Sequence, residues 1–362
     1  MDLSGFWNGR RVLITGHTGF KGGWLSLWLS NLQAVVAGYA LGPSTSPNLF
    51  EVARIKDTLC DIRGDINDLK TLAAEMRRFA PEVVFHLAAQ PLVRYSYDNP
   101  LETMQTNIMG TAKVLEAVRE TPSVRAVVIV TTDKCYENQD WAWGYRETDP
   151  LGGYDPYSSS KAAAEIITAS YRNSFFHRDR FADHQVAIAT ARAGNVLGGG
   201  DWASDRLIPD LLRSMAEGEP LMLRNPHSIR PWQHVLEPLH GYLLLARKLI
   251  EHGPDFGESW NFGPSESETL SVLEIVTRLK RELKSSVRLD MDASPQPHEA
   301  NVLRLDTSKA RTQMGWRPAL SIDQTIAWIS EWTFCHQRGQ DMRAITVNQI
   351  ERYQALLGDR FQ

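Results

Sequence analysis

Residues 11–22, Arg11-Val-Leu-Ile-Thr-Gly-His-Thr-Gly-Phe-Lys-Gly22, join a short apolar run to three glycines spaced three apart. The apolar run predicts a strand over 11–15, and the apolar spacing over 24–32 predicts a buried helix. The turn between them, GxxGxxG, is a variant of the dinucleotide-binding fingerprint. Its glycines allow a tight turn, a close approach of the backbone to a pyrophosphate and close packing of helix on strand. We therefore predict a dinucleotide site here, the alternative being an ordinary strand-to-helix loop.

Four further runs continue this pattern along the chain. They lie at residues 34–41, 60–66, 81–89 and 124–132. Strands that alternate with helices predict an α/β fold with a doubly wound parallel sheet. The first of these runs ends at Leu41, with neither an acidic residue nor an arginine where the ribose 2′-hydroxyl is usually held. The residues therefore leave NAD and NADP open.

Length and composition limit the class of protein. The chain has 362 residues, 43% of them hydrophobic and 23% charged, with a net charge of −4. This length predicts a large α/β domain with a smaller second lobe. The charge balance favours neither nucleic acid nor a membrane surface as a partner. Three cysteines fit a reducing compartment, and we see no signal peptide or membrane span, so we expect a cytoplasmic protein.

A Tyr-x-x-x-Lys pair, Tyr157 and Lys161, is followed by the helix-favouring segment Ala162-Ala-Ala-Glu165. Residues four apart lie on one face of a helix. An ammonium beside a phenol lowers the pKa of the phenol from about 10, so that Tyr157 becomes a base able to take a proton from an alcohol. The spacing alone also occurs on exposed helices without any function. We interpret the pair as catalytic because the glycine turn and the predicted strands precede it in the chain.

Longer motifs carry a resemblance to a known family. The glycine turn, His86-Leu-Ala-Ala89, Thr132 and the Tyr157/Lys161 pair together resemble the extended short-chain dehydrogenase/reductase superfamily of nucleotide-sugar enzymes, over nearly the whole chain. Within that superfamily, the stretches that resemble the CDP-glucose 4,6-dehydratases are residues 15–24, 132–138, 194–202 and 230–235. The resemblance implies a Rossmann fold, NAD as the cofactor and a nucleotide sugar, with CDP-glucose favoured, as the substrate.

The same resemblance implies which residues bind the cofactor. They are Gly16, Thr18, Gly19, Phe20, Lys21, Gly22, Asp65, Ile66, Leu87, Ala88, Ala89, Tyr157 and Lys161. Asp65 would lie beside the adenine amino group, and its alternative is a solvated loop carboxylate. We predict no metal site.

The reaction implied by the resemblance is an internal redox cycle on one sugar. Tyr157 takes the proton of the 4-hydroxyl while NAD⁺ takes the C4 hydride, and the resulting 4-ketone acidifies the C5 proton. Thr132 holds the 4-oxygen, and Asp133 is the acid at the C6 hydroxyl. Lys134 handles the C5 proton, and the hydride then returns to C6.

Lys134 departs from the dTDP-glucose dehydratases, which carry Glu after the Asp. An ammonium acts as a base only where burial or a nearby positive charge lowers its pKa. The alternative for Asp133 and Lys134 is a surface ion pair at a strand end. The sequence also leaves open a 4-epimerase, which needs no such acid and base, and a non-catalytic dinucleotide-binding protein.

The regular alternation ends after Arg192, where the glycine-rich loop 198–202 begins a different region. We predict a dinucleotide-binding domain formed by residues 1–192 plus about 229–264. A mixed α/β lobe that binds the nucleotide sugar would comprise about 193–228 plus 265–362. Near its end, Ile322, Ile326 and Ile329 predict one apolar face of a helix.

The resemblance also implies substrate ligands and subunit pairing. The substrate-binding candidates are Gln90, Asn195, Arg206 and Arg230. The two arginines would offer forked donors to the phosphate oxygens. The helix around 103–120 would pair with the helix after Tyr157 across a two-fold axis, in a homodimer or a dimer of dimers. Val114, Ala117 and Val118 are the apolar residues expected at that interface.

Overall fold

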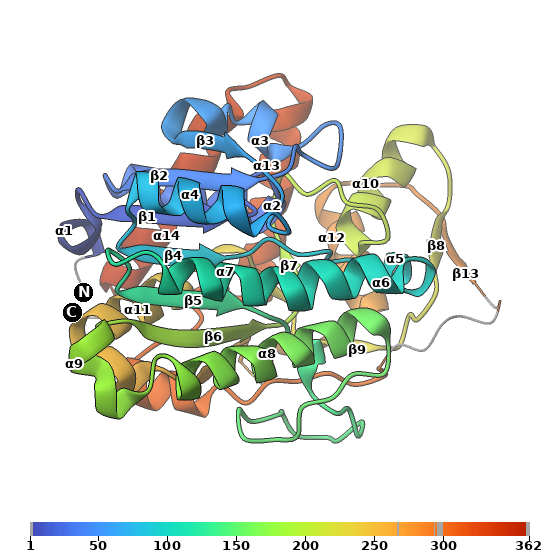
Figure 1. Cartoon of the computed structure of the whole chain (residues 1–362). Helices are drawn as coiled ribbons and strands as arrows, with labels where there is room; N and C mark the ends of the chain where they lie inside the picture. The colour runs from blue at the N-terminus through green and yellow to red at the C-terminus, as the bar shows by residue number, and fades with distance from the viewer. Residues whose placement is uncertain (1–2, 266–267, 293, 295–299, 360–362) are drawn as a thin grey trace.

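A computed structural model describes residues 3–265, 268–292, 294 and 300–359 (Figure 1). Its centre is a seven-stranded parallel sheet with the order β11-β6-β5-β4-β1-β2-β3. The strands are β1 Arg11–Thr15, β2 Val35–Ala40, β3 Cys60–Arg63, β4 Val83–His86, β5 Ala126–Val130, β6 Ala187–Ala193 and β11 Ser259–Phe262. The predicted doubly wound parallel sheet is therefore confirmed.

Helices cover both faces of this sheet. On one face lie α2 Phe20–Asn31, α11 Leu236–His252 and α14 Met342–Asp359, and on the other lie α4 Leu69–Phe79, α7 Gly110–Arg119 and α8 Pro156–Ser174, which are in front in Figure 1. Successive side chains of a strand point to opposite faces. Val12 and Ile14 accordingly join the core under α2 and α11, whereas Leu13 joins the core under α4 and α7.

Shorter elements complete the chain. The remaining helices are α1 Leu3–Trp7, α3 Leu49–Val52, α5 Val93–Asp98, α6 Pro100–Met104, α9 Phe181–His184, α10 Leu207–Glu217, α12 Val272–Glu282 and α13 Ile322–Gln337. The 3-10 turns are η1 Ile55–Thr58, η3 Asp133–Cys135, η4 Arg178–Arg180 and η5 Gly253–Phe256, and the π turns are η2 Gln105–Met109 and η7 Ala310–Met314. The short strands are β7 Val196–Leu197, β8 Leu221–Leu223, β9 Ile229–Arg230, β10 Gln233–His234, β12 Leu270–Ser271 and β13 Leu289–Met291.

A separate apolar cluster lies beyond the carboxyl ends of the sheet strands. It joins α10, α12 and α13 to the parallel pair β8 and β13, to the right in Figure 1. Ile322, Ile326 and Ile329 are all buried in this cluster, as the predicted apolar face requires. The C-terminal helix α14 instead packs on α2 through the ring contact between Tyr353 and Trp28.

Two expectations about the helix around 103–120 need correction. The segment is interrupted by the π turn η2, because the buried Asn107 turns its amide toward the Gln90 backbone and the Ser160 hydroxyl. Val114, Ala117 and Val118 do not face a second subunit. They are buried against the sheet, where amphipathic packing of α7 places its apolar side.

Among the described residues, the structure contains no helix long and apolar enough to cross a bilayer.

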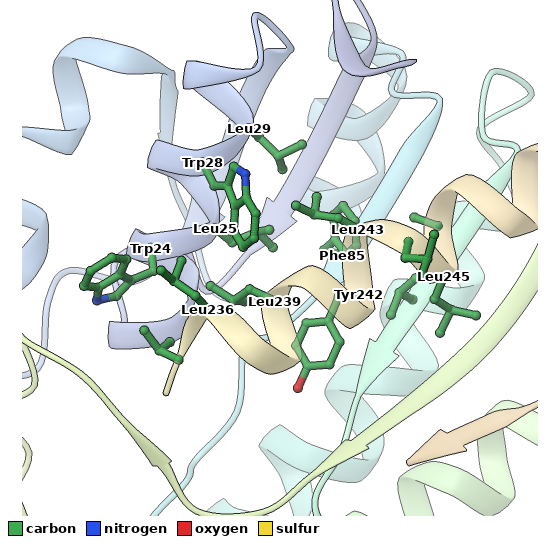
Figure 2. Packing of buried hydrophobic residues seen from close by; sticks show 14 of the residues in the cluster. Trp24, Leu25, Trp28, Leu29, Phe85, Leu236, Leu239, Tyr242, Leu243 and Leu245 are labelled. Atoms are coloured by element: carbon green, nitrogen blue, oxygen red, sulfur yellow. The ribbon is translucent and has the colours of Figure 1, made fainter. Parts of the chain in front are cut away.

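The contact between α2 and α11 is part of the larger apolar core (Figure 2). Trp24 and Leu25 of α2 lie near Leu236 and Leu239 of α11, and Phe85 of β4 lies beside Leu243. Because α2 begins at the glycine turn, this packing fixes the turn against the sheet.

Leu243→Ala should destabilise the protein by about 2–5 kcal/mol, since a fully buried leucine leaves a cavity when it is truncated. The matched control is Leu41→Ala, because Leu41 is 62% exposed and its loss should stay within about 0.5 kcal/mol. Urea denaturation of both variants measures the difference. Equal midpoints would contradict the packing described above.

Candidate active site

One large cavity lies between the carboxyl ends of the strands and the apolar cluster of α10, α12 and α13. Its volume is about 1100 Å³. All the residues predicted to bind cofactor or substrate or to act in catalysis line it: Gly16, Thr18, Gly19, Phe20, Lys21, Gly22, Asp65, Ile66, Leu87, Ala88, Ala89, Gln90, Thr132, Asp133, Lys134, Tyr157, Lys161, Asn195, Arg206 and Arg230. The fold therefore brings these residues to one place, while their individual roles stay predictions.

The glycine turn forms a cradle whose first and third glycines leave no room for a side chain. A Cβ added at Gly16, whose φ is +79°, would lie 2.7 Å from the Ala88 nitrogen, and one at Gly22 would lie 2.1 Å from the Gly16 oxygen. The helix α2 starts directly after Gly19 without a side-chain cap. Backbone N–H groups at such a helix start attract anions. The cradle therefore fits the pyrophosphate of a dinucleotide.

The far end of the cradle shows why the sequence could not distinguish NAD from NADP. After β2 the cavity wall is formed by the uncharged residues Leu41, Ser44, Thr45 and Asn48. Asp65 lines the cavity after β3, is exposed, and accepts a hydrogen bond from the Asn67 backbone at 2.8 Å. Its contact with an adenine stays a prediction.

One buried contact beside the cradle was missed at the sequence level. The His17 ring fills the space that a Cβ at Gly38 would occupy, only 2.1 Å from its nearest atom. His17 Nε2 lies 2.8 Å from Asp61 Oδ1. Burial lowers the pKa of His17, and the Asp61 carboxylate opposes that shift. A glycine in the middle of the second strand was the only local signal of this contact.

Tyr157 and Lys161 enter the cavity from the first turns of α8. The helix begins after Asp155, whose carboxylate accepts a hydrogen bond from the Ser158 nitrogen at 2.9 Å. Lys161 Nζ donates to the Val130 carbonyl at 3.1 Å, and burial lowers the pKa of Lys161 to about 8. α8 thus presents both side chains on one face.

The pKa of Tyr157 moves opposite to the sequence-based expectation. Burial raises it to about 12, while the hydrogen bond with Thr132 and the charge of Arg206 lower it. Desolvation of the phenolate therefore outweighs nearby charge in the chain by itself. The net lowering predicted for the pKa of Tyr157 is therefore wrong for the chain without cofactor. Lys161 Nζ donates to the Val130 carbonyl.

Asp133 is a buried carboxyl group at the end of β5. Its Oδ1 accepts a hydrogen bond from the Thr132 hydroxyl at 3.0 Å, and its Oδ2 has no partner among the described residues. Burial raises the pKa of Asp133, and the charges of Lys134 and Arg230 partly offset this rise. A carboxyl group that retains its proton more readily, with one oxygen free, suits a general acid.

Lys134 is half-buried and lines the cavity directly beside Asp133. Its backbone N–H donates to the Thr132 hydroxyl at 3.4 Å. Lys134 therefore belongs to the cavity wall, whereas the alternative predicted an ion pair with Asp133 on the surface.

The predicted substrate ligands are placed in different ways. Arg206 donates to Asp201 Oδ2 at 2.9 Å, a partner that the sequence did not suggest. The nearly buried Arg230 donates to the Ile229 carbonyl at 3.0 Å. Gln90 uses its side-chain amide within the protein, donating to the Thr103 hydroxyl at 2.8 Å. The two arginines therefore supply positive charge to the cavity wall, whereas the Gln90 amide helps to hold its own loop.

Comparison with known proteins places the chain in a family. The model of the family described as GDP-mannose 4,6 dehydratase matches residues 13–329. The chain is 49% identical to the CDP-glucose 4,6-dehydratase of Salmonella typhimurium over 348 residues, which cover 96% of the chain and 97% of the relative. The sequence-based resemblance to the CDP-glucose 4,6-dehydratases is thereby confirmed.

Solved structures agree in fold. The dTDP-glucose 4,6-dehydratase of Streptomyces venezuelae, crystallised with NAD bound, has a TM-score of 0.76 and 24% identity, covering 92% of this chain and 99% of that one. The UDP-glucose 4-epimerase of Thermotoga maritima has a TM-score of 0.77 and 20% identity, covering 90% and 99%. Fold alone does not separate a dehydratase from an epimerase, so the assignment rests on sequence. From the match over residues 13–329 and the 49% identity along nearly its whole length, we conclude that the chain belongs to the GDP-mannose 4,6 dehydratase family within the short-chain dehydrogenase/reductase superfamily.

Proposed function

We propose that this chain is an NAD-dependent lyase that converts CDP-glucose to CDP-4-keto-6-deoxyglucose and water. The observation that carries the proposal is the 49% identity to a CDP-glucose 4,6-dehydratase over 96% of the chain. The buried carboxyl of Asp133, a residue of the cavity wall, favours this reaction over 4-epimerisation, which needs no acid at C6. The cradle from Gly16 to Gly22 would hold the cofactor.

The first half of the reaction oxidises C4 of the glucose to a ketone, removing the hydrogen on C4 as a hydride and the hydrogen of the 4-hydroxyl as a proton. NAD⁺, which the cradle from Gly16 to Gly22 would hold, would supply the hydride acceptor for C4 and the hydride donor for C6. Tyr157 removes the proton of the 4-hydroxyl, and Thr132, whose hydroxyl bonds to the phenol, holds the same oxygen. Because burial raises the pKa of Tyr157 to about 12, the positive charge of Lys161 and of the cofactor is needed to make proton removal effective near neutral pH.

The second half eliminates water. The 4-ketone stabilises a carbanion at C5, so Lys134 removes the C5 proton while Asp133 protonates the C6 hydroxyl, which leaves as water. Burial raises the pKa of Asp133, which favours the protonated form that an acid needs. A hydride then adds to C6 of the C5–C6 double bond and a proton adds to C5. The only net change in the sugar is the loss of one water.

Binding of the sugar nucleotide falls to the second lobe in our proposal. Arg206, Arg230 and Asn195 line the cavity and would hold the diphosphate. The proposed division keeps residues 1–192 plus about 229–264 as the dinucleotide-binding domain and about 193–228 plus 265–362 as the lobe. The parallel pairing of β11 with β6 supports it. The helix α14, although in the lobe range, would tie the two parts together through α2.

We also propose a homodimer in the cytoplasm. Leu101 of α6, Met109 of η2 and Ile166 of α8 are 80%, 46% and 58% exposed, unusual for apolar side chains on neighbouring helices. A second copy related by two-fold symmetry would cover them. The cytoplasmic location is supported by Cys60, Cys135 and Cys335, which are all unpaired.

The main test offers the purified protein a panel of nucleotide-glucoses with NAD. We expect the alkali-dependent absorbance of a 4-keto sugar with CDP-glucose, and deuterium placed at C4 should appear at C6 of the product. Tyr157→Phe is the control and should lower turnover about 10² to 10⁴-fold. Loss of the label to water, or net formation of NADH, would replace the dehydratase by a simple dehydrogenase.

Lys134→Met tests the base at C5. The variant should still oxidise C4, because Tyr157 and Lys161 are untouched, but it should stall before elimination. Reduced nicotinamide would then accumulate on the enzyme and be visible by its near-ultraviolet absorbance. Lys56→Met, an exposed lysine outside the cavity, is the matched control. Turnover at the wild-type rate with no such signal would remove Lys134 from the mechanism.

Ile166→Asp should separate the subunits, since a charge in a covered apolar surface is strongly disfavoured. Sedimentation velocity would show a monomer for the variant and a dimer or larger assembly for the wild type. Met291→Asp is the control, because Met291 is similarly exposed at 52% but lies on β13 in the lobe. A wild type that sediments as a monomer contradicts this proposal.

A further inference from the structure

A buried ion pair lies behind the catalytic face of α8. Arg192 Nη2 of β6 and Glu165 Oε2 of α8 are 2.9 Å apart, and each side chain is only 2% exposed. Neither residue lines the cavity. Burying two charges is expensive unless further hydrogen bonds satisfy them. The surroundings of Glu165 therefore indicate what the pair does.

The Glu165 carboxylate accepts hydrogen bonds from three neighbouring strands. Thr131, directly after β5, donates at 2.5 Å, and Thr190 of β6 donates at 2.6 Å. Ser259 of β11 donates at 3.1 Å. Arg192 donates its second amino group to the Tyr136 hydroxyl at 2.8 Å. One side chain of α8 is thus bonded to the segment after β5, to the middle of β6 and to the first residue of β11.

The position of Glu165 connects it to the acid–base residues. It lies one helical turn beyond Lys161 and two turns beyond Tyr157 on the same side of α8. Its partner Thr131 is the neighbour of Thr132 in the chain. Lys161 and Glu165 bond in succession to Val130 and Thr131, so the two contacts align α8 with the end of β5.

The charge of Glu165 also acts on Lys161. The titratable groups facing Lys161 are Glu165, Cys135, His86 and Lys21. Burial keeps Cys135 and His86 neutral, because it raises the pKa of the thiol far above its usual range and lowers the pKa of His86 to about 3. Lys21 adds a repelling charge. Glu165 is therefore the negative charge among these groups that favours the ammonium form of Lys161.

We propose that Glu165, held by Arg192, is a positioning residue that aligns Tyr157, Lys161 and Thr132 with one another and keeps Lys161 charged. This inference rests on the proposed function, since it takes Tyr157 and Lys161 as the acid–base pair. Glu165 itself acts through other residues, and it is not placed in contact with the substrate.

The test uses Glu165→Gln/Arg192→Gln, which removes both charges and keeps hydrogen-bonding groups. Without the Glu165 charge, the pKa of Lys161 falls below its present value of about 8. The alkaline limb of kcat/KM, where Lys161 loses its proton, should therefore move to lower pH by about one unit. Ser259→Ala, the matched control, deletes one hydrogen bond to Glu165 without changing charge and should leave the limb in place.

Two further measurements make the result decisive. Circular dichroism and NADH fluorescence establish that the double variant folds and binds; if it does so and its limb is unmoved, the proposal is overturned. Should it fail to fold, Glu165→Asp decides. That variant keeps the charge and withdraws the carboxylate by one methylene, so kcat should fall about 10²-fold with KM nearly constant and the limb unchanged. A wild-type kcat would overturn the positioning role.

The pH dependence of NADH affinity separates this inference from the proposed function. This measurement requires no sugar nucleotide. In the double variant, the fall of NADH affinity with rising pH should occur at a lower pH than in the wild type. If the wild type binds NADH but leaves CDP-glucose unchanged, the proposed function is wrong, and the Glu165 inference is judged on the NADH curves alone. Identical NADH curves for wild type and double variant would overturn it.

Discussion

Parallel hydrogen bonding of the seven central strands forces every segment that follows a strand to the same edge of the sheet. The glycine turn follows β1, Gln90 lies just after β4, Thr132 follows β5 and Asn195 follows β6. Gly16 and Asn195, which are 179 positions apart in the chain, therefore line one cavity. The proposed chemistry depends on this arrangement, because no one segment supplies the glycine cradle, the acid–base candidates and the substrate-binding candidates together.

Enclosure of that edge sets the protonation states. Removing water penalises every charge, so burial raises the pKa of Tyr157 and Asp133 and lowers that of Lys161 and Lys21. An acid that keeps its proton is useful for expelling a hydroxyl group. A phenol with a raised pKa is a poor base unless positive charge stands nearby. The site therefore depends on groups that keep its cations charged, and the buried Glu165 is one of them.

The sequence predicted the parts of this protein that are encoded locally. The strand, the three glycines and the next helix form one uninterrupted signal, and Tyr157 and Lys161 are linked by helical spacing. The contacts of Asp201 with Arg206, Glu165 with Arg192 and His17 with Gly38 were not predicted. Apart from the contact of Asp201 with Arg206, which lie five positions apart in one loop, these contacts join separate elements. An isolated acid or glycine carries no sign of its partner. The pKa of Tyr157 was mispredicted for the same reason, since burial is a property of the whole fold.

The charge of the cavity follows from these contacts and bears on the substrate. Arg206 lowers the pKa of both Tyr157 and Lys21, so one guanidinium links the phosphate-facing wall to the catalytic groups. On the proposed function, a diphosphate at Arg206 adds negative charge there. Its field raises the pKa of Lys21 from about 7 and weakens the pull of Arg206 on the phenol. Proton removal by Tyr157 then relies more heavily on the positive charges of Lys161 and the cofactor. Once substrate is bound, the protein must therefore keep Lys161 charged and aligned with Tyr157.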